Sequence, residues 1–266
     1  MSSKMPLKFA ANLSMMFTEF PTLAERYEAA KDAGFKYVEA TFPYGEDAGT
    51  LAEARRRAGL EHVLINGWPG ELSAGDLGIA ALRSRKLEFV DKLEMSIKYA
   101  NALNCKRMHI MAGKRPEAEE DVYLENIKYA ADRLQKEGIL ALIEAVNSKL
   151  SAPGYFMDEP ERGLEYVKKI NHPNLKFQFD FFHVQIMSGN LTENLKKFLP
   201  HIGHIQISQV PDRGEPDDQG EITYPYIFRL LQELGYDGYV GLEYKPRGTT
   251  LEGLQWLEKA GCDLTL

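Results

Sequence analysis

The sequence predicts a (β/α)8 TIM barrel, an α/β fold in which eight parallel strands are enclosed by helices. Short apolar segments alternate with amphipathic helical segments over nearly the whole chain of 266 residues, which is typical of this fold. No linker rich in Pro, Ser or Gly divides the chain, so we expect one domain spanning residues 1–266. An open doubly wound sheet would show the same alternation and is the alternative fold. The chain lacks both the GxGxxG and the GxxxxGKS/T motifs, so no nucleotide cofactor is expected.

The strands are predicted from short apolar or alternating runs that are bounded by turn residues. They are expected at residues 7–13, 36–42, 60–66, 106–111, 138–144, 175–180, 201–208 and 239–243. Between them, Gly34, Gly59 and Gly235 are typical of helix ends. Pro116, which acidic residues follow, predicts the first turn of a helix. The stretch 78–104 is expected to form one long helix.

Composition limits the classes of partner. A net charge of −7 and a pI near 5.5 argue against a nucleic-acid partner, because phosphates attract basic surfaces. No apolar run approaches the roughly 20 residues needed to span a bilayer, and the N-terminus lacks the apolar segment of a secretory signal. The two cysteines, Cys105 and Cys262, provide neither a disulfide framework nor a thiolate metal cluster. We therefore expect a cytoplasmic protein that acts on a small molecule, without a membrane partner. Self-association into a homo-oligomer is left open.

Polar side chains occur at the ends of the last four expected strands, where the active site of such a barrel lies. The four residues are Glu144, Asp180, Gln206 and Glu243. In the stretch LKFQFD, Asp180 shares one face of its strand with Gln178, and phenylalanines occupy the other face. The same alternation surrounds Gln206 and Glu243. We therefore expect the apolar face to meet the helices and the polar face to point into the barrel.

Three carboxylates and one amide that converge in this way require a cation, because like charges at close range raise one another's pKa. Oxygen donors suit a hard divalent ion such as Mg²⁺ or Mn²⁺, so one such ion is the expected cofactor. Each residue also has a simpler interpretation. Asp180 could cap the next helix, Glu243 could pair with Lys245 or Arg247, Glu144 could form a buried salt bridge, and the glutamine could be structural.

The chain resembles the hydroxypyruvate isomerase family of the xylose isomerase-like barrels. The resemblance lies in the stretches LIEAVN, FDFFH, HIQISQVPDRGEP and GLEYKPRGTTLEGLQW, and also in FAANLSMMFTEFP and HIMAGKRPE. It implies one divalent cation held by Glu144, Asp180, Gln206 and Glu243, with the two glutamates as proton donor and acceptor. The related ketose 3-epimerases usually carry histidine in place of Gln206. Gln206 therefore favours a hydroxypyruvate isomerase. The epimerases also have a glutamate near Asn147, and its absence here argues against polyol-like sugar substrates.

The expected reaction is the conversion of hydroxypyruvate to 2-hydroxy-3-oxopropanoate (tartronate semialdehyde) through an enediolate. Arg213 is predicted to bind the substrate carboxylate, although it could instead pair with an acid of its own loop, Asp212 or Glu215. His183 is predicted to hold a substrate oxygen, with a structural imidazole as the alternative. Further candidates for substrate binding, which rest on weaker signals, are His109, Lys245 and Asn66, with Trp68 as a wall of the pocket.

Other functions are compatible with the same scaffold. An isomerase or epimerase of a related small sugar or sugar acid, such as a 2-oxo-tetronate or a ketose, is the main alternative. A metal-dependent hydrolase or endonuclease would need extra histidine ligands and a basic groove, and the chain has six histidines and a net charge of −7. A binding protein without catalytic activity would not need both Glu144 and Glu243.

Overall fold

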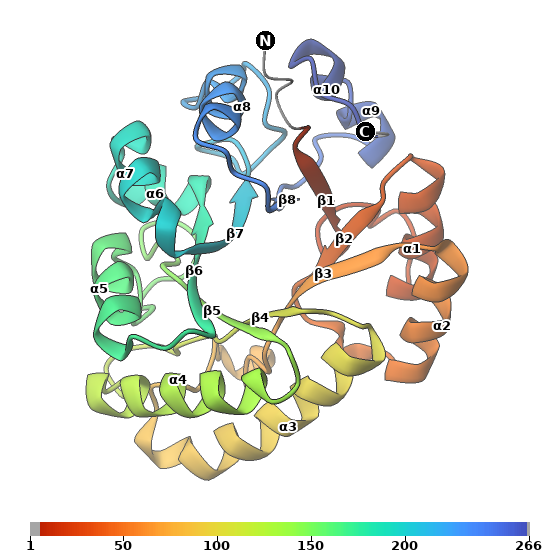
Figure 1. The fold of residues 1–266 in the computed structure, drawn as a ribbon. Helices are drawn as coiled ribbons and strands as arrows, with labels where there is room; N and C mark the ends of the chain where they lie inside the picture. The colour runs from red at the N-terminus through yellow and green to blue at the C-terminus, as the bar shows by residue number, and fades with distance from the viewer. Residues whose placement is uncertain (1–5, 265–266) are drawn as a thin grey trace.

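Eight parallel strands close into a barrel in the order β1 to β8, as the computed structural model shows for residues 6–264 (Figure 1). Strand β1 closes the barrel by pairing with β8, with Ala10 opposite Gly241. This closure confirms the barrel and excludes the doubly wound sheet. The predicted domain of residues 1–266 extends at both ends beyond the described residues.

Every strand lies within the range expected from the sequence. The strands are β1 Lys8–Asn12, β2 Tyr37–Ala40, β3 Glu61–Asn66, β4 Arg107–His109, β5 Leu140–Glu144, β6 Leu175–Asp180, β7 Ile202–Ile207 and β8 Tyr239–Leu242. The helices surround the barrel (Figure 1). They are α1 Leu23–Asp32, α2 Ala48–Ala58, α3 Lys86–Ala102, α4 Glu120–Gln135, α5 Pro160–Ile170, α6 Phe181–Met187, α7 Leu191–Phe198, α8 Tyr224–Glu233, α9 Thr250–Gly253 and α10 Trp256–Lys259.

Two predicted helix starts were wrong. Helix α4 begins at Glu120, and Pro116 follows a cis peptide bond in the loop before it. The long helix expected over 78–104 begins only at Lys86, after a short 3₁₀ turn. Gly78 has a φ of +93° and lies against the backbone of Met111, where a Cβ would approach within 2.4 Å. The chain is therefore held to the end of β4 before it enters the helix.

The barrel interior has an apolar layer below a polar one. Ala10, Leu64 and Leu142, in the middle of their strands, belong to one enclosed apolar cluster. Two residues further along the same strands stand Asn12, Asn66 and Glu144. Apolar side chains of the opposite parity pack outward: the rings of Phe177 and Phe179 lie 5.1 and 5.6 Å from the ring of Phe198 in α7. The predicted parity is confirmed, and it places the polar side chains at the carboxyl mouth.

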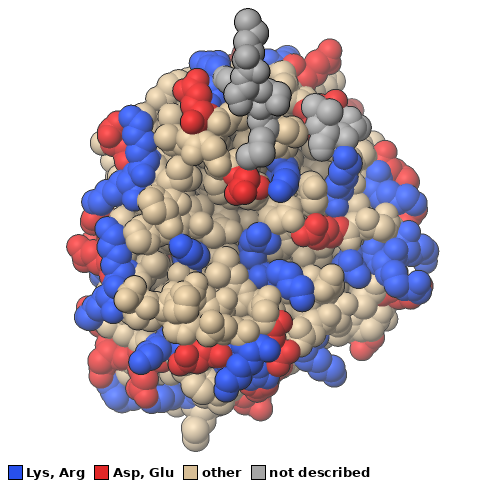
Figure 2. Space-filling model, viewed as in Figure 1, with Lys and Arg blue, Asp and Glu red and all other residues tan. Residues whose placement is uncertain are grey.

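Charged residues of both signs are intermingled on the face shown in Figure 2. None of the helices in residues 6–264 is both long and apolar enough to cross a membrane.

Candidate active site

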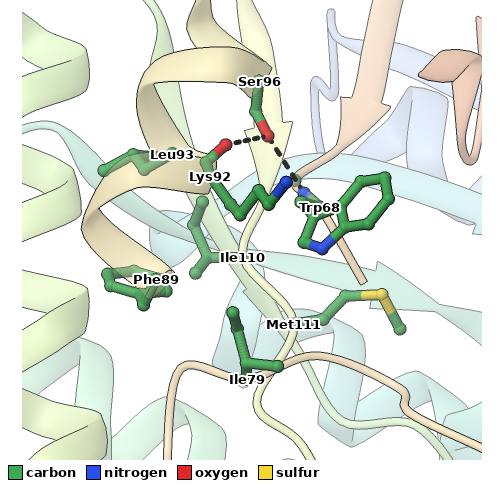
Figure 3. Close-up of a pocket in the computed structure, with 9 residues that line it drawn as sticks. Trp68, Ile79, Phe89, Lys92, Leu93, Ser96, Ile110 and Met111 are labelled. Atoms are coloured by element: carbon green, nitrogen blue, oxygen red, sulfur yellow. Dashed lines mark hydrogen bonds between the residues drawn. The ribbon is translucent and has the colours of Figure 1, made fainter. Parts of the chain in front are cut away.

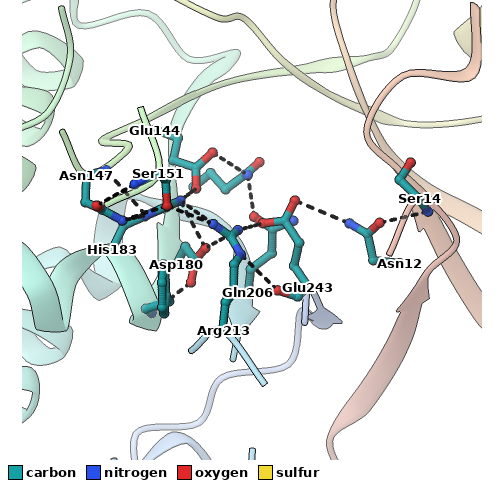
Figure 4. Close-up of polar contacts among 12 residues, drawn as sticks. Asn12, Ser14, Glu144, Asn147, Ser151, Asp180, His183, Gln206, Arg213 and Glu243 are labelled. Atoms are coloured by element: carbon teal, nitrogen blue, oxygen red, sulfur yellow. Dashed lines mark hydrogen bonds and ion pairs between the residues drawn. The ribbon is translucent and has the colours of Figure 1, made fainter. Parts of the chain in front are cut away.

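Asp180 ends β6 and begins α6, and both predicted interpretations of this residue are compatible with its contacts. Its Oδ1 accepts a hydrogen bond of 2.8 Å from the backbone N–H of Phe182, so the side chain caps the helix. Its Oδ2 accepts a bond of 3.2 Å from Arg213 (Figure 4). The strand therefore ends with one oxygen fixed by the helix and the other facing the mouth of the barrel.

Glu144 and Glu243 approach this point from the ends of β5 and β8. Glu144 is buried, and its Oε2 accepts a hydrogen bond of 2.9 Å from Gln178 Nε2. Its Oε1 is buried without a hydrogen-bond partner. Glu243 accepts a short bond from Arg213 and a longer one, 3.4 Å, from Asn12. Glu243 therefore does not use the surface lysine or arginine that the simpler interpretation offered.

Arg213 lies across the mouth and joins two of the predicted site residues. Its Nη2 donates to both Asp180 and Glu243 (Figure 4). Its guanidinium lies 4.8 Å from the centre of the Phe182 ring. The alternative pairing of Arg213 within its own loop is wrong, because Arg247 contacts Asp212, Glu215 and Asp217 instead.

The loop that carries Arg213 is held in place by Gln209. The buried side-chain amide of Gln209 forms hydrogen bonds with the backbone of Val210, Asp217 and Ile222. The backbone carbonyl of Gln209 accepts a hydrogen bond from the N–H of Arg213. Arg213 itself has a left-handed backbone with φ +57°. The arginine is therefore aimed at the site by a well-bonded loop, a relationship between distant residues that sequence spacing does not reveal.

His183, in the first turn of α6, has a defined tautomer. Its Nδ1 accepts from the backbone N–H and the side-chain amide of Asn147, at 3.3 and 2.7 Å. The amide cannot be reversed, because its oxygen already accepts from the N–H groups of Leu150 and Ser151. The proton of the neutral imidazole is therefore on Nε2, which lies 3.4 Å from Asp180 Oδ2. The predicted role and the structural alternative are both compatible with this contact.

His109 and Asn66 lie on neighbouring strands beside Glu144. His109 ends β4, where its Nδ1 is 3.3 Å from Glu144 Oε2, and neither ring nitrogen has a hydrogen-bond partner. Asn66 is paired with His109 in the sheet register, and its side chain contacts Met111. Trp68 and Met111 line a small and largely apolar pocket between β4 and α3 (Figure 3).

Lys245 follows β8 and contacts the loop of Arg213 through its backbone. Its side chain is exposed, and its contact with the site is a backbone N–H that donates to the carbonyl of Arg213. This contact supports the arginine loop and gives no reason to assign the ammonium group to substrate binding.

Gln206 occupies the interior of the barrel between two other polar residues. Its Oε1 accepts from Gln178 at 2.6 Å, and its Nε2 donates to Glu39 at 2.8 Å. Sequence reasoning missed Glu39 and Asn12. The available signal for Glu39 was a single carboxylate within an otherwise apolar strand, YVEA.

The electrostatics of the mouth disfavour bare carboxylates. Burial, followed by the charges of Glu243 and Asp180, raises the pKa of Glu144 well above its usual range. Burial also raises the pKa of Asp180, and it raises the pKa of Glu243 to about 7, although Arg213 opposes both shifts. Burial opposes the charge of Arg213, but the surrounding carboxylates raise its pKa overall. One guanidinium thus faces two buried acids and a third, Glu243, that is half-buried, which leaves the group short of positive charge.

The donor atoms fit a hard divalent cation. Glu144, Asp180 and His183 each offer a ligand atom within 4.8 Å of the others, and Glu144 Oε1 is a buried acceptor without a partner. A histidine that binds a metal through Nε2 normally donates a proton from Nδ1. The Nδ1 of His183 accepts instead, so this side chain is better suited to donate a hydrogen bond than to bind the ion. The remaining donors are carboxylate oxygens, which Mg²⁺ and Mn²⁺ prefer.

Comparison with known proteins places this barrel in a family. A sequence model of the family described as "Xylose isomerase-like TIM barrel" matches residues 27–260. A protein of Danio rerio, provisionally named a hydroxypyruvate isomerase, is 49% identical over 96% of this chain and 95% of its own. Hydroxypyruvate isomerase of Escherichia coli is 41% identical over 95% of this chain and 98% of its own. The chain therefore belongs to the hydroxypyruvate isomerase family within the xylose isomerase-like TIM barrels.

Two further relatives carry other names. A 2-oxo-tetronate isomerase of Pectobacterium atrosepticum is 44% identical over 94% of this chain and 97% of its own. A crystal structure from Brucella melitensis, named "AP endonuclease, family 2", is 43% identical, with a TM-score of 0.91 over 96% of this chain and 99% of that one. Both match almost the full length of this chain, and the Brucella structure shares its fold.

Proposed function

We propose that this protein is an isomerase that interconverts hydroxypyruvate and 2-hydroxy-3-oxopropanoate. The observation that carries the proposal is the placement of two carboxyl groups, the buried Glu144 and the half-buried Glu243, around Asp180 and Arg213 at the carboxyl mouth. The names of the full-length relatives support the same class of substrate, a small hydroxy-oxo acid.

The reaction moves one carbon-bound proton between adjacent carbons. One glutamate removes a proton from C3 of hydroxypyruvate, and the electron pair forms the C2–C3 double bond of an enediolate. The other glutamate delivers a proton to C2, while the hydroxyl proton on O3 moves to O2, so that the aldehyde forms at C3 and atoms balance. Because burial raises the pKa of Glu243 to about 7, this group can both accept and donate a proton near neutral pH. Burial also raises the pKa of Glu144, so this group too can carry a proton when no cation is bound to it.

A divalent cation, Mg²⁺ or Mn²⁺, would be held by Glu144, Asp180, Gln206 and Glu243. When bound, it supplies Lewis-acid stabilisation of the negative charge that develops on the substrate oxygens. Glu144 Oε1 is available for this purpose without the loss of an existing hydrogen bond. Gln206 can use the second lone pair of Oε1, since the first accepts from Gln178.

The substrate carboxylate has a matching donor in Arg213. Its Nη2 is committed to Asp180 and Glu243, but its Nη1 has only long contacts, 3.5 Å to Ser151 and 3.3 Å to His183. This edge of the guanidinium can therefore receive an anion. The Nε2–H of His183 can donate to a substrate oxygen, and the unpaired ring of His109 offers a second polar contact.

Proton NMR of hydroxypyruvate in D₂O tests the proposal directly. With the protein and Mg²⁺, we expect 2-hydroxy-3-oxopropanoate to form with deuterium on carbon, and we expect EDTA to stop both the conversion and the exchange. Conversion that EDTA leaves intact would refute the proposed role of the cation. The absence of both conversion and exchange would refute the proposed isomerase activity. Parallel incubation with abasic-site DNA tests the endonuclease activity for which the Brucella protein is named.

A second candidate substrate is 2-oxo-tetronate, because relatives named 2-oxo-tetronate isomerase are as similar to this chain as the E. coli hydroxypyruvate isomerase. This acid has the same carboxylate and 2-oxo group and one additional hydroxymethyl group. The same two glutamates would move the proton from C3 to C2. Comparison of kcat/KM for the two acids distinguishes these candidates, and the larger value identifies the preferred substrate.

A further inference from the structure

Glu39 is a fully buried carboxylate in the interior of the barrel, one step away from the proposed site. It lies on β2, on the side of the barrel opposite β6 in strand order, and its exposed fraction is 0%. Three hydrogen-bond donors surround it. Asn12 and Gln206 both donate to Oε1, at 2.9 and 2.8 Å, and Nε2 of His204 lies 2.7 Å from Oε2. This degree of satisfaction is what a buried carboxylate requires.

The donors of Glu39 lead to both proposed acid–base residues. On one side, Asn12 uses the same amide nitrogen to reach Glu243, at 3.4 Å. On the other side, the oxygen of Gln206 accepts from Gln178, which also donates to Glu144. Each proposed glutamate is thus connected to the same buried carboxylate through amide side chains only.

The orientation of the Gln206 amide follows from Glu39. A carboxylate accepts and cannot donate, so it selects the NH₂ end of the glutamine and turns the carbonyl oxygen away from itself. That oxygen then faces Gln178 and the glutamate beyond it. In the sequence, nothing distinguishes Gln206 from a glutamine with the opposite orientation.

Strand β8, which is separated from β2 by β1, leaves room for the carboxylate. Gly241 of β8 is paired with Gln206 in the register, and a Cβ at this glycine would lie 2.3 Å from Glu39 Oε2. The backbone of Gly241 has no left-handed conformation that would demand glycine. Space for Glu39 is therefore the reason that this structure offers for a glycine at this point of the strand.

We infer that Glu39 is a positioning residue, which fixes the amide of Gln206 with its oxygen toward the cation site and holds Asn12 against Glu243. The inference rests on the proposed function, because it assigns Gln206 a role in that site. It adds a residue on β2 to a site otherwise built from β5 to β8.

Two variants of Glu39 separate the positioning role from simple burial. Glu39→Met keeps the length of the side chain but removes the acceptor, and we expect the affinity for Mn²⁺ to fall by about 10–100-fold. Glu39→Gln keeps one oxygen for Asn12 and Gln206, while His204 can exchange tautomers to accept from the new amide. This variant should therefore retain most of the affinity. Equal losses in the two variants would show that charge matters rather than orientation, and would overturn the inference.

Gly241→Ala provides an independent test that leaves every proposed ligand in place. The added methyl group must displace Glu39, so the Mn²⁺ affinity of Gly241→Ala should fall by about as much as is expected for Glu39→Met. This test remains available if Glu39→Met does not fold. His62→Gln is the matched control, because His62 is equally buried but bonds Tyr27 outside the barrel interior, and its Mn²⁺ affinity should equal that of the parent.

Two readouts distinguish failure of the inference from failure of the proposed function. A parent protein that neither binds Mn²⁺ nor exchanges substrate protons would refute the proposed function alone. Protection of the Gln206 side-chain amide protons from solvent exchange, followed by NMR, reports the contact with Glu39 whatever the activity. Loss of this protection in Glu39→Met and Gly241→Ala supports the inference, and unchanged protection together with unchanged Mn²⁺ affinity overturns it.

Discussion

Asn147 donates two hydrogen bonds to Nδ1 of His183, one from its backbone and one from its side chain. The pair joins the loop after β5 to the first turn of α6. It holds the histidine neutral with its remaining proton directed at Asp180, and burial lowers the pKa of His183 well below its usual value. Asn147 thus sets the tautomer of His183.

Asn147→Asp should reverse that tautomer. The new carboxylate oxygen accepts rather than donates at the shorter of the two contacts, 2.7 Å, so it favours a proton on Nδ1 of His183 over the longer backbone bond of 3.3 Å. We expect kcat/KM for hydroxypyruvate to fall by about 10–100-fold, as for other residues that orient a group in the site. The ¹⁵N chemical shifts of the His183 ring check the tautomer. Asn126→Asp, at a buried site where the amide bonds the carbonyl of Ala80, is the control for a buried Asn-to-Asp change and should leave kcat/KM intact.

Glu144→Gln should remove catalysis and yet stabilise the protein. The pKa of Glu144 is raised in the folded state, so above the unfolded pKa near 4.3 its ionisation opposes folding increasingly as the pH rises. A neutral glutamine lacks this penalty. Without added metal, the free energy of unfolding of Glu144→Gln should exceed that of the parent at pH 8, and the excess should shrink toward pH 5. Urea denaturation at the two pH values measures it.

The catalytic part of this prediction is a loss of proton exchange by about 10²–10⁴-fold, the usual size of a general acid–base contribution. Exchange of substrate protons in D₂O at the parent rate would refute the role of Glu144. A variant less stable than the parent at pH 8 would refute the electrostatic argument instead.

The sequence predicted the four strand-end residues because parallel strands bring their carboxyl ends together, and because parity assigns each side chain to a face. The position of Asp180 depended only on local alternation. The contacts of Arg213 with Asp180 and Glu243 could not be predicted in this way. They depend on the conformation of the loop that carries Arg213, which Gln209 holds in place. The incorrect start of helix α4 at Pro116 had a similar cause: helix-start chemistry is present there, but the chain is held in an extended loop until Glu120.

Glu39 shows the other limit of sequence reasoning. A single glutamate within an apolar strand is compatible with an edge, a surface or an interior position. Its burial follows from closure of the barrel, which brings His204 and Gln206 from β7 to within hydrogen-bond distance of β2. The residues that flank Glu39 in the sequence give no indication of that contact.

His62 should make stability sensitive to acid. Burial lowers its pKa to about 3, because the folded protein holds the ring neutral between the Tyr27 hydroxyl and the carbonyl of Leu64. The unfolded chain takes up a proton below about pH 6.5, so stability is complete above that value and falls as the pH decreases, by about 1.4 kcal/mol per pH unit from this group. Compared with His62→Gln, the parent should lose more stability between pH 7 and 5. Parallel losses in the two proteins would exclude His62 as the cause.

Binding of Mn²⁺ should strengthen as the pH rises through neutrality. Burial raises the pKa of Glu243 to about 7, so below that pH the cation must displace a proton from this carboxyl group, and above it this carboxyl group is already ionised. The association constant should therefore increase by up to about tenfold per pH unit for each proton displaced, and then level off. Isothermal titration calorimetry at pH 6 and 8, in buffers of different ionisation enthalpy, measures both the affinity and the protons released. Glu243→Gln should bind more weakly at pH 8 and release fewer protons at pH 6. An affinity that is independent of pH in the parent would mean that Glu243 does not take part in binding the cation.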